Sequence, residues 1–394
     1  MLAAEQMQAL PYATQLLARL GAEVVKVEPP GGESGRGSRP AMRDPFGRDV
    51  GATFLRNNLS KRSVAINLKS EAGRELFLRL VPHFDVIAEN FKAGTMARFG
   101  LGYDVIAALH PRAIYVSVSG FGNTGESPYA DWPAYASIVE AMSGIYEYSR
   151  HPDQPPRANP VGALGDISSA LFATIGVLAA LRHRDRTGEG QHVDVAMYDA
   201  TVAMTDIVTN LASLGADRMA FPQPFILDEF RAADGWFVMQ LVREHQFERL
   251  ARVVGRPEWL DDPRLAARAS WGEHLDDVLR PGIEAWAASR TKAEAAAALT
   301  AEGVAAGPCH DAAEVMADAH LARRNMLVEM ERTDGVARPV IVPGNPVKLS
   351  KMTEGPETRV PWVGEHTDEV LRAELGLDDA ELIALTNAGV IARQ

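Results

Sequence analysis

The 394 residues include 46% apolar and 23% charged side chains and carry a net charge of −12, which describes a globular protein and excludes a general nucleic-acid binder. A single cysteine, Cys309, excludes an internal disulfide and a cysteine-based zinc site, and the ten histidines show no metal-binding spacing. No run reaches the about 18 uncharged apolar residues of a membrane span and no signal peptide opens the chain, so we expect a cytoplasmic protein without a metal.

The first 200 residues alternate strand-like and helix-like segments, a pattern that predicts an α/β fold with a mostly parallel sheet. The predicted strands cover 22–28, 63–68, 85–91, 113–121 and 192–199. The predicted helices cover 12–20, 70–84, 94–110 and 166–183. The helix at 166–183 is the most apolar of the chain, and we expect it to be buried. After residue 214 the alternation ends, and shorter helices indicate a second, smaller domain, as a chain of this length favours.

Gly120, Gly122 and Gly125 match the glycine spacing G-x-G-x-x-G directly after a predicted strand. In a dinucleotide-binding fold the third glycine opens a helix, whereas here Pro128 and Pro133 follow. The motif therefore fails its structural requirement. The chain also lacks G-x-S-x-G and H-E-x-x-H, so a hydrolase triad or a catalytic metal has no support from motifs.

The segment 33–62 reverses the overall charge, with seven basic residues against three acidic ones. One interpretation is a solvated loop surface. The other is a rim that binds phosphate groups, because Arg and Lys form charge-assisted hydrogen bonds with phosphates. Both interpretations stay open from the residues alone.

The dipeptide Gly165-Asp166 stands at the beginning of the most apolar predicted helix. An aspartate there is often a simple N-cap. It can equally be a nucleophile, because the positive end of the helix dipole favours an ionised carboxylate.

Seven segments together give the chain its family resemblance. They are PYATQLLARLGAEVVKVEPPGG (11–32), SKRSVAINLKSEAGRELF (60–77), DVIAENFKAGTMARFGLGYD (85–104), SVSGFGNTG (117–125), EAMSG (140–144), GDISSALFATIGVLAALRHRDRTGEGQHVDVAMYDA (165–200) and GEHTDEVLRAELGLDDAELIALTNAGVI (364–391). In this order and spacing the chain resembles the class III CoA-transferase family.

The resemblance implies a Rossmann-like large α/β domain built from 1–205 and 335–394. It implies a smaller α+β domain at 225–325, with linkers at 206–224 and 326–334. Ring-shaped subunits are expected to interlock as a homodimer, without nucleic-acid or membrane partners. The implied reaction moves coenzyme A between an acyl-CoA thioester and a carboxylic acid.

The resemblance also assigns roles to individual residues. Asp166 is implied as the covalent nucleophile with Gln8 beside it, and main-chain N–H groups near 162–165 are candidates for stabilising oxyanions. The implied coenzyme A contacts are Ala9, Ile66, Asn90, Phe91 and Arg98. Because Pro29 and Pro30 replace arginines of some members, Arg36 or Arg39 is expected to supply the phosphate contact.

Three further departures from the family pattern bear on function. The chain begins inside the family's first strand, and Leu10 replaces the glycine usual after Gln8 and Ala9. The segment 215–230 has no counterpart of the glycine-rich lid of formyl-CoA transferase, which argues against oxalate as substrate.

The alternatives to a transferase are an α-methylacyl-CoA racemase, an acyl-CoA hydrolase and an idle coenzyme A-binding protein. The racemases of this fold carry His-Asp where this chain has Tyr135-Ala136. A tyrosine with a pKa of about 10 is a poor base at neutral pH, so racemisation is disfavoured.

Overall fold

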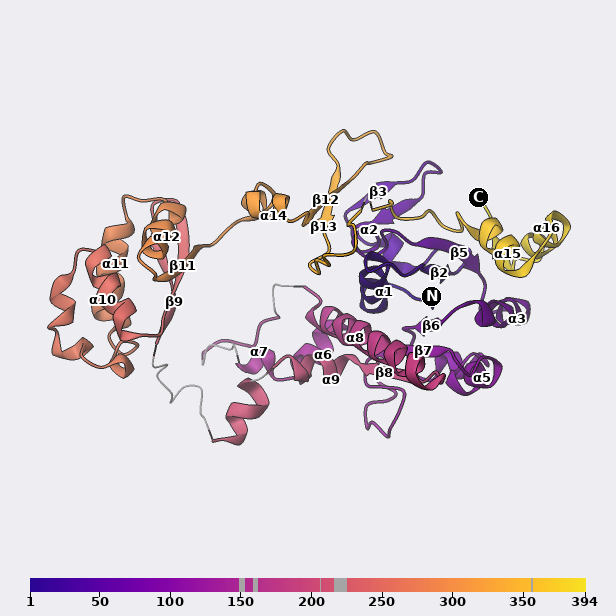
Figure 1. The fold of residues 1–394 in the computed structure, drawn as a ribbon, viewed down its shortest axis with the longest axis horizontal. Coiled ribbons are helices and arrows are strands. Elements are labelled where there is room, and N and C mark those ends of the chain that lie inside the picture. Colours follow the sequence, from indigo (N-terminus) through magenta and orange to yellow (C-terminus); the bar gives the residue numbers. More distant parts are fainter. Residues whose placement is uncertain (149–152, 159–161, 206, 216–224, 356) are drawn as a thin grey trace. The chain divides into compact units, whose positions relative to one another are not determined.

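The computed structural model describes residues 1–148, 153–158, 162–205, 207–215, 225–355 and 357–394. Contacts within the chain separate two compact units (Figure 1). The larger unit comprises Met1–Asn210 together with Arg324–Gln394, and the smaller unit comprises Leu211–Arg323. Both ends of the chain therefore build the same unit.

The larger unit contains a seven-stranded sheet with the strand order β14-β5-β2-β1-β6-β7-β8. Its strands are β1 (Leu2–Ala4), β2 (Val25–Glu28), β5 (Arg62–Ile66), β6 (Val86–Glu89), β7 (Ile114–Ser119), β8 (His192–Ala196) and β14 (Ile391–Ala392). All neighbouring pairs are parallel except β14, which runs antiparallel to β5. The expected α/β fold with a main parallel sheet is confirmed.

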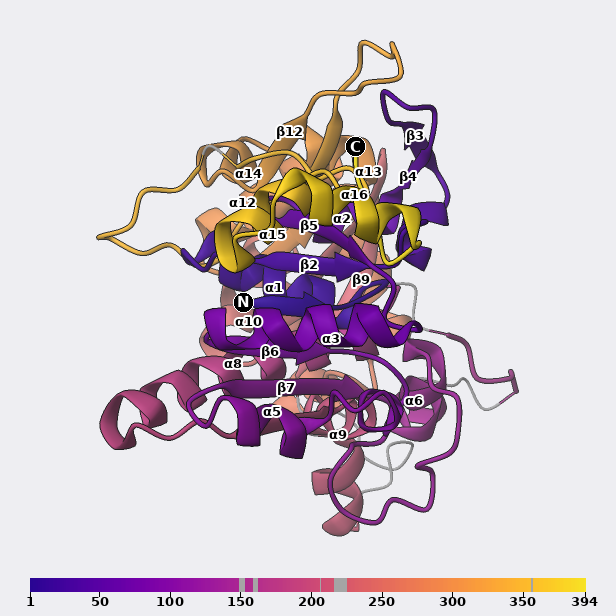
Figure 2. The same cartoon turned by 90° about the vertical axis from the view of Figure 1, so that its right-hand side faces the viewer.

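Helices cover both faces of this sheet, which explains why its central strands are buried along their whole length. Figure 2 shows α3, α5 and α15 in front of the strands, while α1 and α8 pack together against the other face. The helices of this unit are α1 (Ala9–Arg19), α2 (Ala52–Asn57), α3 (Glu71–Leu80), α4 (Thr95–Arg98), α5 (Tyr103–Leu109), α6 (Ala136–Met142), α7 (Ile145–Tyr148), α8 (Leu164–Thr187), α9 (Met197–Ala203), α15 (Thr367–Leu375) and α16 (Asp379–Asn387).

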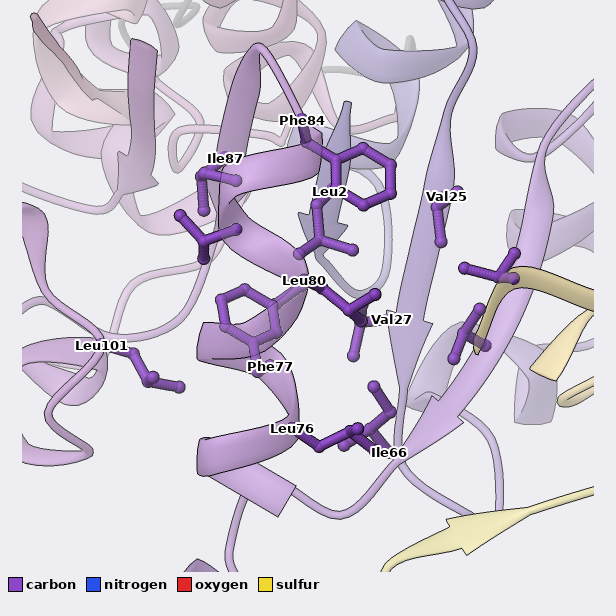
Figure 3. Close-up of a cluster of buried hydrophobic side chains, with 14 of the residues drawn as sticks. Leu2, Val25, Val27, Ile66, Leu76, Phe77, Leu80, Phe84, Ile87 and Leu101 are labelled. Atoms are coloured by element: carbon purple, nitrogen blue, oxygen red, sulfur yellow. The ribbon is translucent and has the colours of Figure 1, made fainter. Parts of the chain in front are cut away.

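The packing of α3 shows how the sequence pattern produces one of these layers. Leu76, Phe77 and Leu80 recur at helical spacing and are buried against strand residues such as Val27 (Figure 3). Burial of side chains of this size stabilises the fold by about 1.5–3 kcal/mol each. Ser70 caps the helix as the sequence indicates, because its hydroxyl accepts a hydrogen bond from the Gly73 N–H at 3.1 Å.

The apolar helix α8 is partly buried, so the expectation of burial holds for one of its faces and not for the other. Among the described residues, α8 alone is long and apolar enough to cross a membrane by length and composition. Its alanine face, including Ala170 and Ala173, is nevertheless packed in the core of the unit. Leu171, Ile175 and Leu178 lie on the opposite face and are 38–59% exposed.

The remaining strands form smaller sheets. In the larger unit β3 (Ala41–Arg43) pairs with β4 (Asp49–Gly51), and β12 (Leu327–Met330) pairs with β13 (Val340–Pro343). The smaller unit contains an antiparallel sheet of β9 (Ile226–Ala232), β10 (Gly235–Leu241) and β11 (Ala305–Pro308). Its helices are α10 (Glu244–Val253), α11 (Arg280–Ala287), α12 (Lys292–Ala301), α13 (Ala312–Met316) and α14 (Ala319–Arg323).

Candidate active site

A cleft of about 580 Å³ lies at the carboxyl edge of the parallel sheet. The segments that follow β1, β6 and β7 line it, together with the beginnings of α6 and α8. Strands β1 and β6 are neighbours, and the chain proceeds from them in opposite directions across the sheet. A crevice at such a topological switch point is where open α/β sheets bind ligands.

The segment after β1 is fixed by buried charges. Glu5 accepts a hydrogen bond from the Lys61 ammonium at 2.7 Å, and both side chains are fully buried. Met7 adopts a left-handed backbone conformation with φ of 60°, and its N–H donates to the Glu33 carboxylate at 3.0 Å. A non-glycine residue holds this conformation only where the surroundings enforce it. Gln8, the next residue, is thereby directed to the cleft.

Asn90 ties the segments after β1 and β6 together. Its Oδ1 accepts from the Gln6 N–H at 2.9 Å, and its Nδ2 donates to the Gln6 carbonyl at 2.9 Å. The next residue, Phe91, donates its N–H to the Glu89 carboxylate at 2.8 Å. Both Asn90 and Phe91 line the cleft, and the amide group of Asn90 is engaged by its two hydrogen bonds to Gln6.

Asp166 lies in the first turn of α8 and lines the same cleft. The N-cap of this helix is Ala163, so the interpretation of Asp166 as an N-cap is wrong. Burial, and next the charge of Glu140, raise the pKa of Asp166 to about 6. Contrary to the sequence-based expectation, the environment as a whole disfavours the ionised carboxylate, although the charged form still predominates at pH 7.

Gly165 explains how α8 approaches α6 so closely. A Cβ atom at this position would lie 2.8 Å from Val139 Cγ2 and 3.1 Å from Ala136 Cα. The missing side chain lets the Gly165 N–H donate to Glu140 Oε1 at 3.1 Å. The Leu164 N–H donates to the Gly162 carbonyl at 3.1 Å. These two amides, expected as oxyanion donors, are therefore already engaged.

Five of the nine residues predicted for the site line the cleft together. They are Gln8, Ala9, Asn90, Phe91 and Asp166. The other four lie elsewhere: Ile66 is buried in the core beneath α3, and Arg98 donates to the Thr95 hydroxyl on the surface.

Arg36 and Arg39 do not line this cleft. Arg36 is 5% exposed, donates two hydrogen bonds to Glu28 at 2.6 and 2.8 Å and stacks on the Phe54 ring. Arg39 is exposed and pairs with Asp49 at 2.8 Å. Because its guanidinium is buried and paired with Glu28, Arg36 is not accessible to a phosphate.

The sequence reasoning missed several residues of the cleft. Lys92, Trp132 and Tyr135 line it. Glu140 does not line the cleft but contacts the first turn of α8 through the Gly165 N–H, and it is 1% exposed. Lys92 follows Asn90 and Phe91 directly, so its place after β6 could have revealed it. The position of Tyr135, treated in the sequence only as a substitute for the racemase histidine, is in the cleft wall.

The glycine motif 120–125 serves a structural purpose. The N–H groups of Asn123 and Thr124 donate to the Asp194 carboxylate at 2.8 and 2.7 Å, which closes the turn. In the described ranges, no three His, Cys, Asp or Glu side chains are grouped so that they could hold a metal ion.

Comparison with known proteins finds relatives over nearly the whole chain. Residues 1–367 match the family described as CoA-transferase family III. The chain is 36% identical over 381 residues to the succinyl-CoA:mesaconate CoA-transferase of Haloarcula marismortui, which covers 95% of this chain and 94% of that protein. It is 35% identical over 407 residues to the formyl-CoA:oxalate CoA-transferase of Streptomyces avermitilis, covering 98% and 96%. A crystal structure of a CaiB/BaiF family protein from Brucella suis matches with a TM-score of 0.82 and 31% identity, covering 95% and 98%.

Proposed function

The chain belongs to CoA-transferase family III and is an acyl-CoA:carboxylate CoA-transferase, and from this premise we propose that Asp166 is its covalent nucleophile. The observation that carries the proposal is the Asp166 carboxylate in the wall of the cleft at the switch point of the sheet. Its pKa of about 6 leaves it ionised at neutral pH and more basic than an ordinary aspartate.

In the first half-reaction an Asp166 oxygen attacks the thioester carbonyl of the donor. The carbon–sulfur bond breaks, which leaves a mixed anhydride on Asp166 and a free coenzyme A thiolate. The thiolate then attacks the aspartyl carbonyl of the anhydride, forms an aspartyl thioester and releases the donor acid as its carboxylate. No net proton is transferred in these steps.

The second half-reaction repeats these steps with the acceptor. The acceptor carboxylate attacks the aspartyl thioester, giving a new anhydride and the thiolate again. Attack of the thiolate on the acyl carbonyl forms the product thioester and regenerates the Asp166 carboxylate. Gln8 lines the cleft, and we assign its amide N–H the role of stabilising a developing oxyanion.

The adduct on Asp166 is the direct test of this mechanism. Incubation with acyl-CoA followed by hydroxylamine is expected to convert Asp166 to a hydroxamate, which peptide mass spectrometry locates. Succinyl-CoA and formyl-CoA are suitable first donors because relatives are named for them. A transferase that turns over while its Asp166 peptide keeps its unmodified mass would refute the proposed nucleophile.

We also propose that two chains form an interlocked homodimer, in the cytoplasm, with each chain a ring. The exposed stripe of Leu171, Ile175 and Leu178 on α8 supports association, because apolar side chains four and three residues apart form one continuous face. Both chain ends build the larger unit, so the chain leaves this unit and returns to it.

Interlocked rings separate only when one of them opens. We therefore expect mass photometry at nanomolar concentration to show a single species of twice the 42.6 kDa chain mass. The dimer should persist through dilution and high salt, because neither opens an interlocked ring, and salt screens only exposed charges. A folded monomer at equilibrium under these conditions would exclude the interlocked arrangement.

A further inference from the structure

Glu140 is a buried acid that the mechanism above does not use. It lies on α6, which packs against the first turn of α8 that carries Asp166, and it is 1% exposed. A buried carboxylate is costly unless hydrogen bonds compensate it. Its two oxygens have separate partners: Oε1 accepts from the Gly165 N–H at 3.1 Å, and Oε2 accepts from the Tyr146 hydroxyl at 2.6 Å.

The first of these contacts acts directly on the turn that carries the nucleophile. Gly165 precedes Asp166, and its N–H is one of the amides that a helix leaves without an intrahelical acceptor. Within the described residues Ala163, the N-cap, makes no side-chain capping bond. Glu140 therefore replaces the missing cap from a neighbouring helix and fixes the orientation of the first turn of α8.

The second effect is electrostatic. Glu140 and Asp166 are two carboxyl groups in a partly buried site, and the charge of Glu140 is one of the two causes that raise the pKa of Asp166. The elements packed against α6 and α8 carry further titratable or charged groups: Tyr12 and Arg19 on α1, Tyr146 and Glu147 on α7, His192 and Asp194 on β8, Tyr198 and Asp199 on α9, and Lys92 and Tyr135 in the cleft.

We propose that Glu140 is a positioning residue for the transferase reaction, holding the first turn of α8 through Gly165 and placing a fixed negative charge beside Asp166. This inference rests on the proposed role of Asp166 as nucleophile. A neighbouring fixed charge makes the Asp166 carboxylate a better nucleophile at pH 7 to 8 and limits the enzyme at acidic pH, where Asp166 becomes protonated.

Glu140→Gln removes the negative charge but keeps the hydrogen bonds to Gly165 and Tyr146. The amide oxygen of the introduced side chain can still accept from the Gly165 N–H, and the Tyr146 hydroxyl can turn to accept from the amide nitrogen. We expect the acidic midpoint of the kcat/KM profile to fall by about one pH unit, from about 6 in the wild type. Glu147→Gln on α7 makes the same change outside this contact and should leave the midpoint in place.

Glu140→Ala removes these hydrogen bonds as well as the charge. It should show the same lowered midpoint and, in addition, a kcat about tenfold or more below that of Glu140→Gln, with KM changed much less. Circular dichroism and the dimer mass confirm that each variant is folded. A Glu140→Gln midpoint equal to that of the wild type would overturn the proposal.

A readout that needs no turnover separates this proposal from the proposed function. In protein labelled with ¹³Cγ-aspartate, the Asp166 resonance is identified by its absence in Asp166→Asn, and its titration is followed with and without Glu140→Gln. A shifted titration with no hydroxamate on Asp166 would refute the nucleophile while retaining the electrostatic effect of Glu140 on Asp166. A normal hydroxamate with an unshifted titration would refute the role of Glu140 alone.

Discussion

Replacing Asp166 with asparagine is expected to reduce transfer on the order of 10⁴-fold or more, because loss of a covalent nucleophile removes the whole reaction path. The asparagine is nearly isosteric, so α8 should keep its first turn against α6. Binding of acyl-CoA to the cleft, measured by calorimetry, should persist within a few-fold. Retention of more than a hundredth of wild-type turnover would contradict the assignment.

The same substitution should also stabilise the folded protein at neutral pH. The pKa of Asp166 is raised to about 6 in the fold, above its value of about 3.9 in an unfolded chain, so its ionised form is disfavoured by folding. Above pH 6 this cost is fully present, and it disappears below pH 4, where both states bind the proton. Asp166→Asn should therefore gain on the order of 1 kcal/mol of unfolding free energy at pH 8 and nothing near pH 3.5.

The parallel sheet could be predicted from the sequence because short segments rich in Val, Ile and Ala alternate with helical segments. β2, β6, β7 and β8 fall within predicted strands, and β5 begins one residue before the strand predicted at 63–68. The residue pattern does not predict β1 and β14, since three and two residues carry no periodicity of their own and are strands only because β2, β6 and β5 pair with them. The expected helix at 94–110 is divided into α4 and α5, because Gly100 and Gly102 interrupt it.

Charges were the part of the site that the sequence could not place. A run of basic residues at 33–62 suggested a surface, yet Arg36 and Lys61 are buried against Glu28 and Glu5. The partner of a buried ion is set by tertiary packing and leaves no local pattern. Glu140 is another example, since its spacing on α6 does not reveal that it faces the first turn of α8.

Substitution of Gly165, the residue before Asp166, is expected to have the second large effect on turnover. Gly165→Ala is expected to lower kcat on the order of 10²-fold, because a shift of even about 1 Å displaces a catalytic group from its productive position. The new Cβ would lie 3.1 Å from Ala136 Cα and 3.3 Å from the Ala136 carbonyl oxygen. Main-chain atoms of a packed helix cannot turn away as a side chain can, so the first turn of α8 must move. This movement lengthens the bond from Gly165 to Glu140 and reorients Asp166.

Two controls show whether the effect comes from this contact. Gly307→Ala adds the same methyl group where a Cβ meets no atom within 4 Å, and should leave kcat unchanged. Val139→Ala combined with Gly165→Ala removes the 2.8 Å contact with the valine but keeps the contact with the Ala136 main chain. The double variant should regain part of the about 1–3 kcal/mol lost to overpacking, measured by thermal unfolding, without regaining kcat. If the double variant also regained kcat, the loss in Gly165→Ala would come from the contact with the Val139 side chain. The proposed clash with the Ala136 main chain would then be refuted.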